Sequence, residues 1–323
     1  MKIYMTKKLL PQGMQLLHRY TDDLQINDSD TKLSREDLLQ KVQGAVALAT
    51  LLSDKIDKEV MDAAGPQLKI IANYAVGYNN IDIQEATKRG IMVTNTPDVL
   101  TNATADLAWA LIMAVSRRIV EADIFVRQGK FTEWAPQLML GMELTGKTIG
   151  ILGAGRIGQA TARRAKAFDM NILYCSRYDK FAFEVETKAK RVGLEELLKK
   201  SDIVSIHLPL VAETKHLLDF HELNLMKDNA ILINTGRGAI INEKALVEIL
   251  KKGKLAGVGL DVYEKEPKIE PELLEMKNTV LLPHIGSATQ ETREKMSVMV
   301  AENIIAALSG KKPANLINKE LAK

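Results

Sequence analysis

The fold of this chain follows from residues 148–158, which read Thr148-Ile149-Gly150-Ile151-Leu152-Gly153-Ala154-Gly155-Arg156-Ile157-Gly158. The first five residues form an apolar run typical of a buried strand. The glycines that follow have the spacing G-x-G-x-x-G, which permits a tight turn, close approach of a pyrophosphate and close packing of the next helix. We expect a helix from this loop to about Phe168, with free N–H groups that face phosphate. The segment therefore predicts a dinucleotide-binding domain.

Short apolar runs alternate with amphipathic stretches on both sides of this motif, as in repeated strand and helix units that form parallel sheets. After the motif, strands are expected at Asn171 to Cys175, Ile203 to Leu208, Ala230 to Asn234, Ala256 to Asp261 and Thr279 to Leu282. Before it, strands are expected at Lys2 to Met5, Asp23 to Ile26, Ala45 to Leu48, Lys69 to Ala72 and Ile91 to Thr94. The sequence thus predicts an α/β protein with two doubly wound parallel-sheet domains.

Two long helical segments set the expected domain boundaries. Apolar residues recur at helical spacing in Asn102 to Arg118, which we expect to lead from one domain into the other. They recur again in Ser287 to Leu308, which we expect to return to the first domain. This places residues 1–99 with 287–323 in a substrate domain and residues 100–286 in an inserted Rossmann domain. A shorter helix, Arg35 to Val42, is expected behind a cap formed by Ser34 and Asp37.

The composition indicates an ordinary globular protein, with 323 residues, 46% hydrophobic and 26% charged residues, and a formal charge of +3. Lysines and arginines are scattered, which argues against a nucleic-acid partner. No apolar run reaches the roughly 20 residues that span a bilayer, and the first residues lack the apolar core of a signal peptide. The single cysteine, Cys175, fits a reducing compartment. We expect a cytoplasmic protein that has no metal site.

The end of the second strand of the inserted domain bears on the choice of cofactor. An NAD site would have Asp or Glu there, about 20 residues after the glycine loop, to bind the ribose hydroxyls. This chain instead has Cys175-Ser176-Arg177. Because Ser176 and Arg177 can bind a 2′-phosphate that a carboxylate would repel, the sequence favours NADP(H). NAD(H) stays an alternative, with Asp179 on the ribose.

Three charged residues follow three late strands: Arg237 after Asn234-Thr235-Gly236, Glu266 before Pro267, and His284 after Leu282-Pro283. Each could be an ordinary surface or loop residue. Because ligands bind at the carboxyl ends of parallel strands, their shared position indicates a site. An arginine can bind a carboxylate and a carbonyl, while a histidine beside a carboxylate can deliver a proton. The set predicts hydride transfer to a 2-oxo acid.

The chain resembles the D-isomer-specific 2-hydroxyacid dehydrogenases, and among them the glyoxylate and hydroxypyruvate reductase branch. The resemblance covers nearly the whole chain. It includes the glycine loop, Val76-Gly77-Tyr78-Asn79-Asn80-Ile81-Asp82, His207-Leu208-Pro209-Leu210, Asn234-Thr235-Gly236-Arg237-Gly238, Asp261 to Pro267 and Pro283-His284-Ile285-Gly286-Ser287-Ala288-Thr289. It implies that His284 is the acid/base, that Glu266 pairs with it, and that Arg237 orients the substrate. The implied reaction reduces glyoxylate or hydroxypyruvate to the D-2-hydroxy acid, in a protein with a flavodoxin-like substrate domain.

The resemblance also implies further contacts. The cofactor would meet the glycine loop with Arg156 and Ile157, and also Thr104, Ser176, Arg177, Leu208, Pro209, Thr214, Thr235, Asp261 and Gly286. Asp261 could instead cap the turn after its strand. The substrate would meet Leu51, Val76, Gly77 and Trp134. Trp134 resembles an aromatic residue that such reductases place in the neighbouring subunit, although a core anchor is an alternative. A homodimer through the Asn102 to Arg118 helix and the Trp134 arm is expected.

Two other functions stay open at this point. A dinucleotide-sensing regulatory protein can keep this fold and these three charged residues without turnover. A dehydrogenase for another substrate, such as 2-ketogluconate or phosphite, would also have the glycine loop. A formate dehydrogenase would pair the histidine with glutamine, and Glu266 departs from that pattern.

Overall fold

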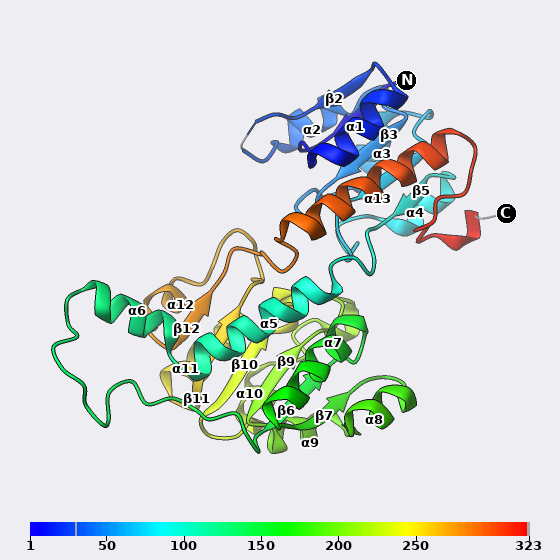
Figure 1. The fold of residues 1–323 in the computed structure, drawn as a ribbon. Helices are drawn as coiled ribbons and strands as arrows, with labels where there is room; N and C mark the ends of the chain where they lie inside the picture. The colour runs from blue at the N-terminus through cyan, green and yellow to red at the C-terminus, as the bar shows by residue number, and fades with distance from the viewer. Residues whose placement is uncertain (30, 322–323) are drawn as a thin grey trace. The chain divides into compact units, whose positions relative to one another are not determined.

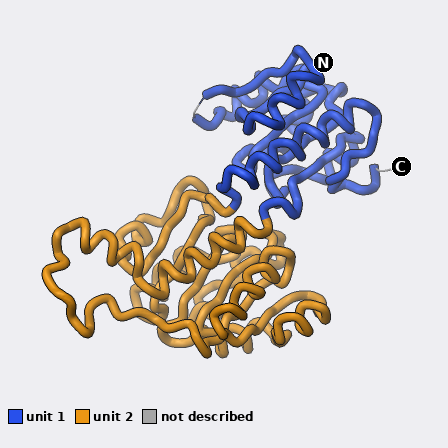
Figure 2. The backbone as a smooth tube through the Cα atoms, viewed as in Figure 1, with its two compact units in different colours: residues 1–100, 287–323 blue, residues 101–286 orange. Residues whose placement is uncertain are grey.

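The computed structural model describes residues 1–29 and 31–321, so residues 322 and 323 of the expected substrate domain lie outside the described part. Contacts divide the chain into two compact units (Figure 2). Unit 1 consists of residues 1–100 and 287–323, and unit 2 consists of residues 101–286. Each unit has its own parallel sheet with helices on both faces (Figure 1). The predicted α/β fold with two parallel sheets is confirmed.

Unit 2 has a seven-stranded parallel sheet with the order β12-β11-β10-β9-β6-β7-β8. Its strands are β6 Thr148–Leu152, β7 Asn171–Cys175, β8 Lys190–Arg191, β9 Ile203–Ile206, β10 Ala230–Asn234, β11 Leu255–Leu260 and β12 Thr279–Leu281. The chain begins at the centre with β6, moves outward to β8, and then crosses to β9 on the other side. This reversal beside β6 is the switch point at which doubly wound sheets bind ligands.

The helices of unit 2 connect these strands. They are α5 Thr101–Ser116, α6 Ile119–Arg127, α7 Arg156–Ala165, α8 Phe181–Thr187, α9 Leu194–Lys200, α10 Phe220–Leu225, α11 Glu243–Lys251 and α12 Pro271–Glu275. Short 3₁₀ turns lie at Lys166–Phe168, Ala212–Thr214 and Gly238–Ile240. The expected helix from the glycine loop to Phe168 is thus an α-helix that tightens into a 3₁₀ turn.

Unit 1 has a five-stranded parallel sheet with the flavodoxin-like order β2-β1-β3-β4-β5. Its strands are β1 Ile3–Met5, β2 Leu24–Ile26, β3 Ala47–Thr50, β4 Ile70–Asn73 and β5 Met92–Thr94. Its helices are α1 Pro11–Tyr20, α2 Arg35–Lys41, α3 Lys58–Ala64, α4 Ile83–Lys88 and α13 Gln290–Leu308, with a 3₁₀ turn at Lys319–Leu321. The last helix returns to this unit and packs beside α1 and β4 (Figure 1).

Both faces of the unit 1 sheet are buried, which explains why its strands read as continuous apolar runs. Tyr4, Leu48 and Ile71 belong to the core on one face. Ile3 and Ala47, their neighbours in the chain, belong to the core on the other face. Side chains alternate across a strand, so each of these strands supplies both cores.

Several element boundaries differ from the sequence prediction for physical reasons. β9 ends at Ile206 instead of Leu208, because Pro209 has no N–H with which to continue the ladder. The helix expected over Asn102 to Arg118 ends at Ser116, since Arg118 has the left-handed φ of 54°. The last helix begins after Thr289, not at Ser287, because the Thr289 side chain caps it by accepting from Thr292 N at 3.2 Å.

The structure also bears on one predicted helix cap and contains one strand that the sequence did not reveal. The expected cap of α2 is confirmed, since Ser34 Oγ accepts from Asp37 N at 3.1 Å. The sequence prediction missed β8, because two exposed basic residues give no apolar signal.

None of the helices in the described residues is long and apolar enough to cross a membrane.

Candidate active site

The glycine loop joins β6 to α7 with the geometry that a dinucleotide phosphate needs. Gly153 has a φ of 102°, and a Cβ there would lie 2.8 Å from the carbonyl carbon of His207. A Cβ at Gly158 would lie 2.1 Å from Gly153 O. Gly155 instead has open space at its Cβ position and caps the ten-residue helix α7, whose first turn has no acidic residue. The N–H groups and positive dipole of this helix end therefore suit an anion.

The surroundings of this loop also fit a nicotinamide dinucleotide. Thr235, which follows β10, has a buried hydroxyl that finds no hydrogen-bond partner among the described residues. Leu208 and Pro209 follow β9, and Thr214 closes their loop by donating to Pro209 O at 2.7 Å. An unpaired buried hydroxyl costs free energy that a bound ligand can recover. These residues therefore fit the cofactor that the glycine loop indicates.

The end of β7 lies beside the glycine loop, since Gly153 N donates to Cys175 O at 2.9 Å. Ser176 is half-buried there and Arg177 is exposed. Sequence analysis missed the residue that shapes this loop, Arg191 on β8. Arg191 donates to Ser176 O and Arg177 O at 3.0 Å each and pairs with Asp179 at 2.8 Å. The carboxylate of Asp179 is therefore already balanced by a guanidinium.

His284 and Glu266 form a hydrogen-bonded pair, as the sequence suggested. Nδ1 of His284 donates to Oε2 of Glu266 at 2.8 Å, and Oε1 of Glu266 accepts from Tyr263 N at 3.1 Å. Burial raises the pKa of Glu266, but the hydrogen bond and charge of His284 outweigh it, so the pKa lies below its usual range. Glu266 therefore stays ionised at neutral pH, and its carboxylate loses its charge only as the pH falls through that lowered pKa. The carboxylate fixes which nitrogen of the ring is free.

Asp261, at the end of β11, holds the loop that carries His284. Its carboxylate accepts from Ile285 N at 2.7 Å and from Gly286 N at 2.8 Å, and its side chain is buried. Burial raises the pKa of Asp261, against the effect of these two N–H donors. Thr104 on α5 donates to Gly286 O at 3.1 Å. The side chain of Asp261 therefore caps the loop after β12, and not the turn after its own strand that the sequence offered as the alternative.

Arg237 follows β10 in a loop that is held from both sides. Asn234 donates to Arg237 O at 3.0 Å and accepts from Gly236 N at 3.0 Å. Behind it, a Cβ at Gly238 would lie 1.9 Å from the carbonyl carbon of Tyr263, so only glycine fits. Burial lowers the pKa of the Arg237 guanidinium, and the charge of Glu266 opposes that effect. Arg237 and Glu266 thus interact electrostatically within unit 2.

The residues of unit 1 that are expected to contact the substrate follow two neighbouring strands. Leu51 comes directly after β3, and its N–H donates to Asp54 Oδ2 at 2.8 Å. Val76 and Gly77 lie in the loop after β4 and are half-buried. Because β3 and β4 are adjacent and parallel, these residues lie at the same edge of the sheet.

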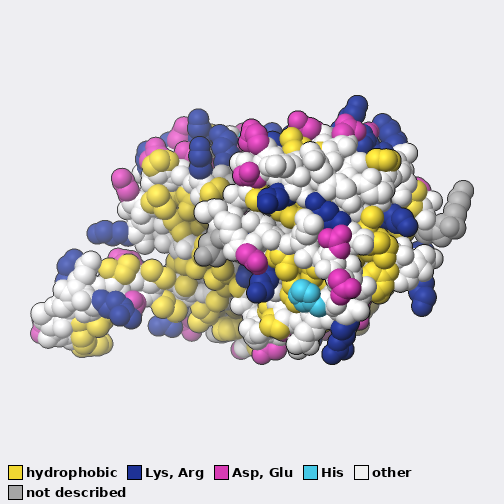
Figure 3. All heavy atoms as spheres, turned by 90° about the horizontal axis from the view of Figure 1, so that it is seen from above, with side chains coloured by type: hydrophobic (Ala, Val, Ile, Leu, Met, Phe, Trp, Pro, Cys, Tyr) yellow, Lys and Arg dark blue, Asp and Glu magenta, His cyan; other side chains and the backbone are white. Residues whose placement is uncertain are grey.

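Trp134 lies on a long arm between α6 and β6, and its side chain is 77% exposed. The alternative of a core anchor is therefore wrong. Figure 3 shows hydrophobic side chains along this projecting arm. The apolar side chains exposed on α6 and the arm are Ile119, Val120, Ile124, Val126, Phe131, Trp134, Leu138 and Leu140.

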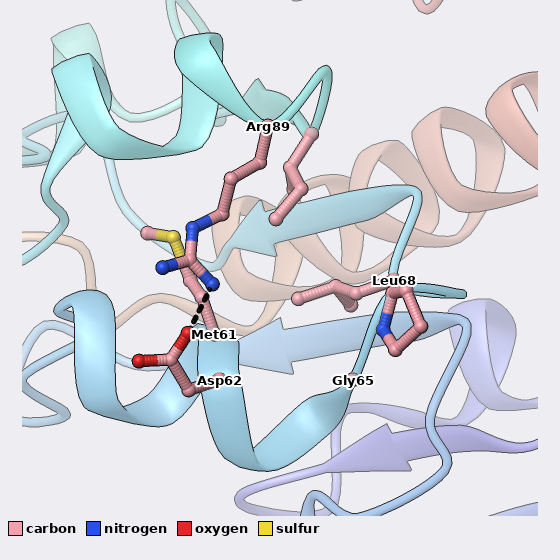
Figure 4. A pocket seen from close by; sticks show the side chains of 7 residues that line it. Met61, Asp62, Gly65, Leu68 and Arg89 are labelled. Atoms are coloured by element: carbon pink, nitrogen blue, oxygen red, sulfur yellow. Dashed lines mark ion pairs between the residues drawn. The ribbon is translucent and has the colours of Figure 1, made fainter.

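Other parts of the described chain offer no metal site, and the charged residues of one unit 1 pocket are paired. No group of three or more His, Cys, Asp or Glu within residues 1–29 and 31–321 is placed to hold a metal ion. A pocket in unit 1 is lined by Met61, Leu68 and Ile91, with an Arg89–Asp62 ion pair of 2.7 Å at its side (Figure 4). Arg89 also pairs with Glu85 at 2.7 Å, so its charge is balanced by protein.

Comparison with known proteins gives a consistent result. The model of the NAD binding domain of D-isomer specific 2-hydroxyacid dehydrogenases matches residues 109–286. A glyoxylate reductase of Thermococcus litoralis is 53% identical and covers 99% of this chain and 97% of its own length. The structure of a Paecilomyes thermophila glyoxylate reductase has a TM-score of 0.88 and 35% identity, covering 99% and 98% of the two chains.

A third relative is known with ligands. It is an NADPH-dependent glyoxylate/hydroxypyruvate reductase of Sinorhizobium meliloti, solved in complex with NADP and malonate. Its TM-score is 0.84 and its identity 32%, covering 98% of this chain and 96% of the other.

Proposed function

This chain belongs to the D-isomer specific 2-hydroxyacid dehydrogenase family, and we propose that it uses NADPH to reduce glyoxylate and hydroxypyruvate. The product is the 2-hydroxy acid, of D configuration where it is chiral. The observation that carries this proposal is the His284–Glu266 pair of 2.8 Å in the unit that also has the glycine loop and Arg237. The glycine loop follows β6, Arg237 follows β10, Glu266 follows β11 and His284 follows β12. These strands belong to one parallel sheet, so their carboxyl ends lie at the same edge.

The residues divide the reaction between them. When bound, the dinucleotide supplies the hydride that reduces the carbonyl carbon. Because Glu266 occupies Nδ1 of His284, the Nε2 atom is the one that gives a proton to the carbonyl oxygen. The guanidinium of Arg237 binds that oxygen and the substrate carboxylate through two N–H groups. In unit 1, the N–H groups of Val76 and Gly77 also bind the carboxylate, and Leu51 borders the substrate.

A panel of glyoxylate, hydroxypyruvate, pyruvate, 2-ketogluconate and phosphite, each assayed with the matching form of both cofactors, tests this function. We expect the highest kcat/KM with glyoxylate or hydroxypyruvate and NADPH. Binding of cofactor without turnover of any substrate would instead support the dinucleotide-sensing alternative, which the curated relatives do not favour.

We further propose a preference for NADPH over NADH. The supports are Ser176 and Arg177 at the end of β7 and the balanced charge of Asp179. Replacing Arg177 with aspartate should lower the ratio of the NADPH and NADH specificity constants by about 100-fold, as expected when a charged hydrogen bond is lost and a repulsion added.

The matched control for this experiment is Arg163→Asp, which reverses the charge of another exposed arginine in unit 2. It should leave the ratio near that of the wild type. A wild-type enzyme that prefers NADH would overturn the proposal, and so would equal effects of the two substitutions.

We also propose that the chain forms a homodimer whose interface includes α5, α6 and the arm. A cytoplasmic location is proposed because the chain has a single cysteine. The support for the homodimer is the set of exposed apolar side chains on α6 and the arm, because such patches mark interfaces. Replacing Trp134 with serine should raise KM for glyoxylate several-fold if the arm reaches the partner's substrate. Sedimentation of the full chain measures the assembly, and a monomeric wild type would contradict the proposal.

A further inference from the structure

We propose that Asn95 is a positioning residue for the substrate carboxylate, on which it acts through the main chain of Val76 and Gly77. This inference rests on the proposed function, because it assumes that the two N–H groups bind a carboxylate. It goes beyond the proposed function by assigning a role to a side chain that does not itself touch the substrate. Asn95 follows β5, the strand that pairs with β4 in parallel register.

The N–H groups of Val76 and Gly77 are available to a ligand. Neither donates a hydrogen bond to another residue in the described part of the chain. Both residues are only half-buried. Successive main-chain N–H groups that point to the same side of a loop form a site for an anion. What decides the affinity of such a site is how firmly its two peptide planes are held.

Both planes are held from their carbonyl side by residues 95 and 96. In a trans peptide the C=O and the N–H point in opposite directions, so a bond to one fixes the other. Ala75 O accepts from Thr96 N at 2.8 Å, which fixes the plane that carries the N–H of Val76. Val76 O accepts from Asn95 Nδ2 at 2.8 Å, which fixes the plane that carries the N–H of Gly77. The second hold is a side chain, so a substitution can remove it.

Two further asparagine side chains hold the same loop through hydrogen bonds to main-chain oxygens. Asn73, which is fully buried, donates to Gly77 O at 2.9 Å. Asn80 donates to Leu51 O and Asp54 O at 3.0 Å each, which ties this loop to the loop after β3. Asn73 is fully buried and Asn80 bridges two loops, so the loss of either amide would leave more than one polar group unpaired. Half-buried Asn95 is therefore the position where orientation can be tested with the least effect on folding.

The test replaces Asn95 with aspartate, which has the same shape but puts an oxygen against Val76 O. Repulsion should turn the plane that carries the Gly77 N–H. We expect KM for glyoxylate and Kd for oxamate, a carboxylate that is not reduced, to rise about tenfold or more, as for one lost charged hydrogen bond. We expect kcat to change by less than about threefold, because the contact is the same in the ground and transition states. Kd for NADPH should not change.

Asn171→Asp is the matched control, since Asn171 Nδ2 also donates to a main-chain oxygen, that of Gly146, at 3.0 Å. It makes the same change of charge at the amino end of β7 and should leave KM and Kd at wild-type values. If the aspartate variant does not fold, as judged by thermal unfolding, Asn95→Ala should give a smaller rise in the same two constants.

The outcomes separate the two proposals. Wild-type KM and oxamate Kd in a folded Asn95 variant would overturn the positioning role while leaving the function intact. A wild-type protein that neither binds oxamate nor reduces glyoxylate would overturn the function, and this inference with it. A fall in kcat with unchanged KM and Kd would also count against the inference.

Discussion

Replacing His284 with glutamine is expected to lower kcat for glyoxylate reduction by about 10²–10⁴-fold, the usual contribution of a positioned general acid. Glutamine has similar length and can still donate to Glu266, which holds Nδ1 of the native ring at 2.8 Å. It cannot release a proton to the carbonyl oxygen. The loss should therefore appear in kcat, while Kd for NADPH, set by the glycine loop, stays near its wild-type value. Steady-state kinetics and fluorescence titration measure the two quantities.

The chain offers a close control for this experiment in a second histidine–glutamate pair. His216 and Glu264 form a 3.0 Å contact in the same unit, and both are part-buried. His216→Gln removes the same type of hydrogen bond and should keep kcat within about threefold of the wild type, as for a residue that transfers no proton. Near-normal turnover of the His284 variant, or equal losses in the two variants, would refute the assignment of His284 as the acid.

The grouping of Arg237, Glu266 and His284 could be predicted because all three follow strands of one parallel sheet, whereas the pairing of His284 with Glu266 was implied by the family resemblance. In such a sheet, strands that are distant in the sequence end at the same edge, and a count of apolar runs is enough to find them. β6, β7 and β10 accordingly have the predicted bounds. The glycine loop gave a second fixed point, since its spacing follows from steric limits that the backbone imposes.

What the sequence could not provide is the partner of each polar group. Asp261 accepts from N–H groups that lie 24 and 25 residues later, and Arg191 donates to carbonyls 15 and 14 residues earlier. Apolar periodicity reports which side of an element is buried, and it carries no information about such contacts. The sequence also failed to predict β8, because its two residues are basic and exposed and so give no apolar pattern.

Replacing Arg237 with methionine should lower kcat/KM for glyoxylate by about 10²–10⁴-fold, because truncating one partner of a hydrogen-bonded charge pair between a protein and its ligand costs about 2–5 kcal/mol. The guanidinium is half-buried, donates to Gly236 O at 2.8 Å, and lies within the electrostatic influence of Glu266. Methionine keeps the length of the side chain but offers no donor to the substrate. Kd for NADPH should change little, because the glycine loop and β7 are untouched.

Arg237→Lys separates charge from geometry. Lysine keeps the positive charge near Glu266 but has no planar fork, so it cannot donate two parallel N–H bonds to the carboxylate and the carbonyl. We therefore expect kcat/KM for the lysine variant to stay at least about 10-fold below the wild type and above the methionine variant. Arg164→Lys is the control and should leave kcat/KM near the wild-type value; Arg164 pairs with Asp106 at 2.7 Å and donates to Ala160 O at 2.8 Å. A lysine variant of Arg237 with wild-type kcat/KM would show that charge alone suffices, and the two-point contact with the 2-oxo acid would have to be abandoned.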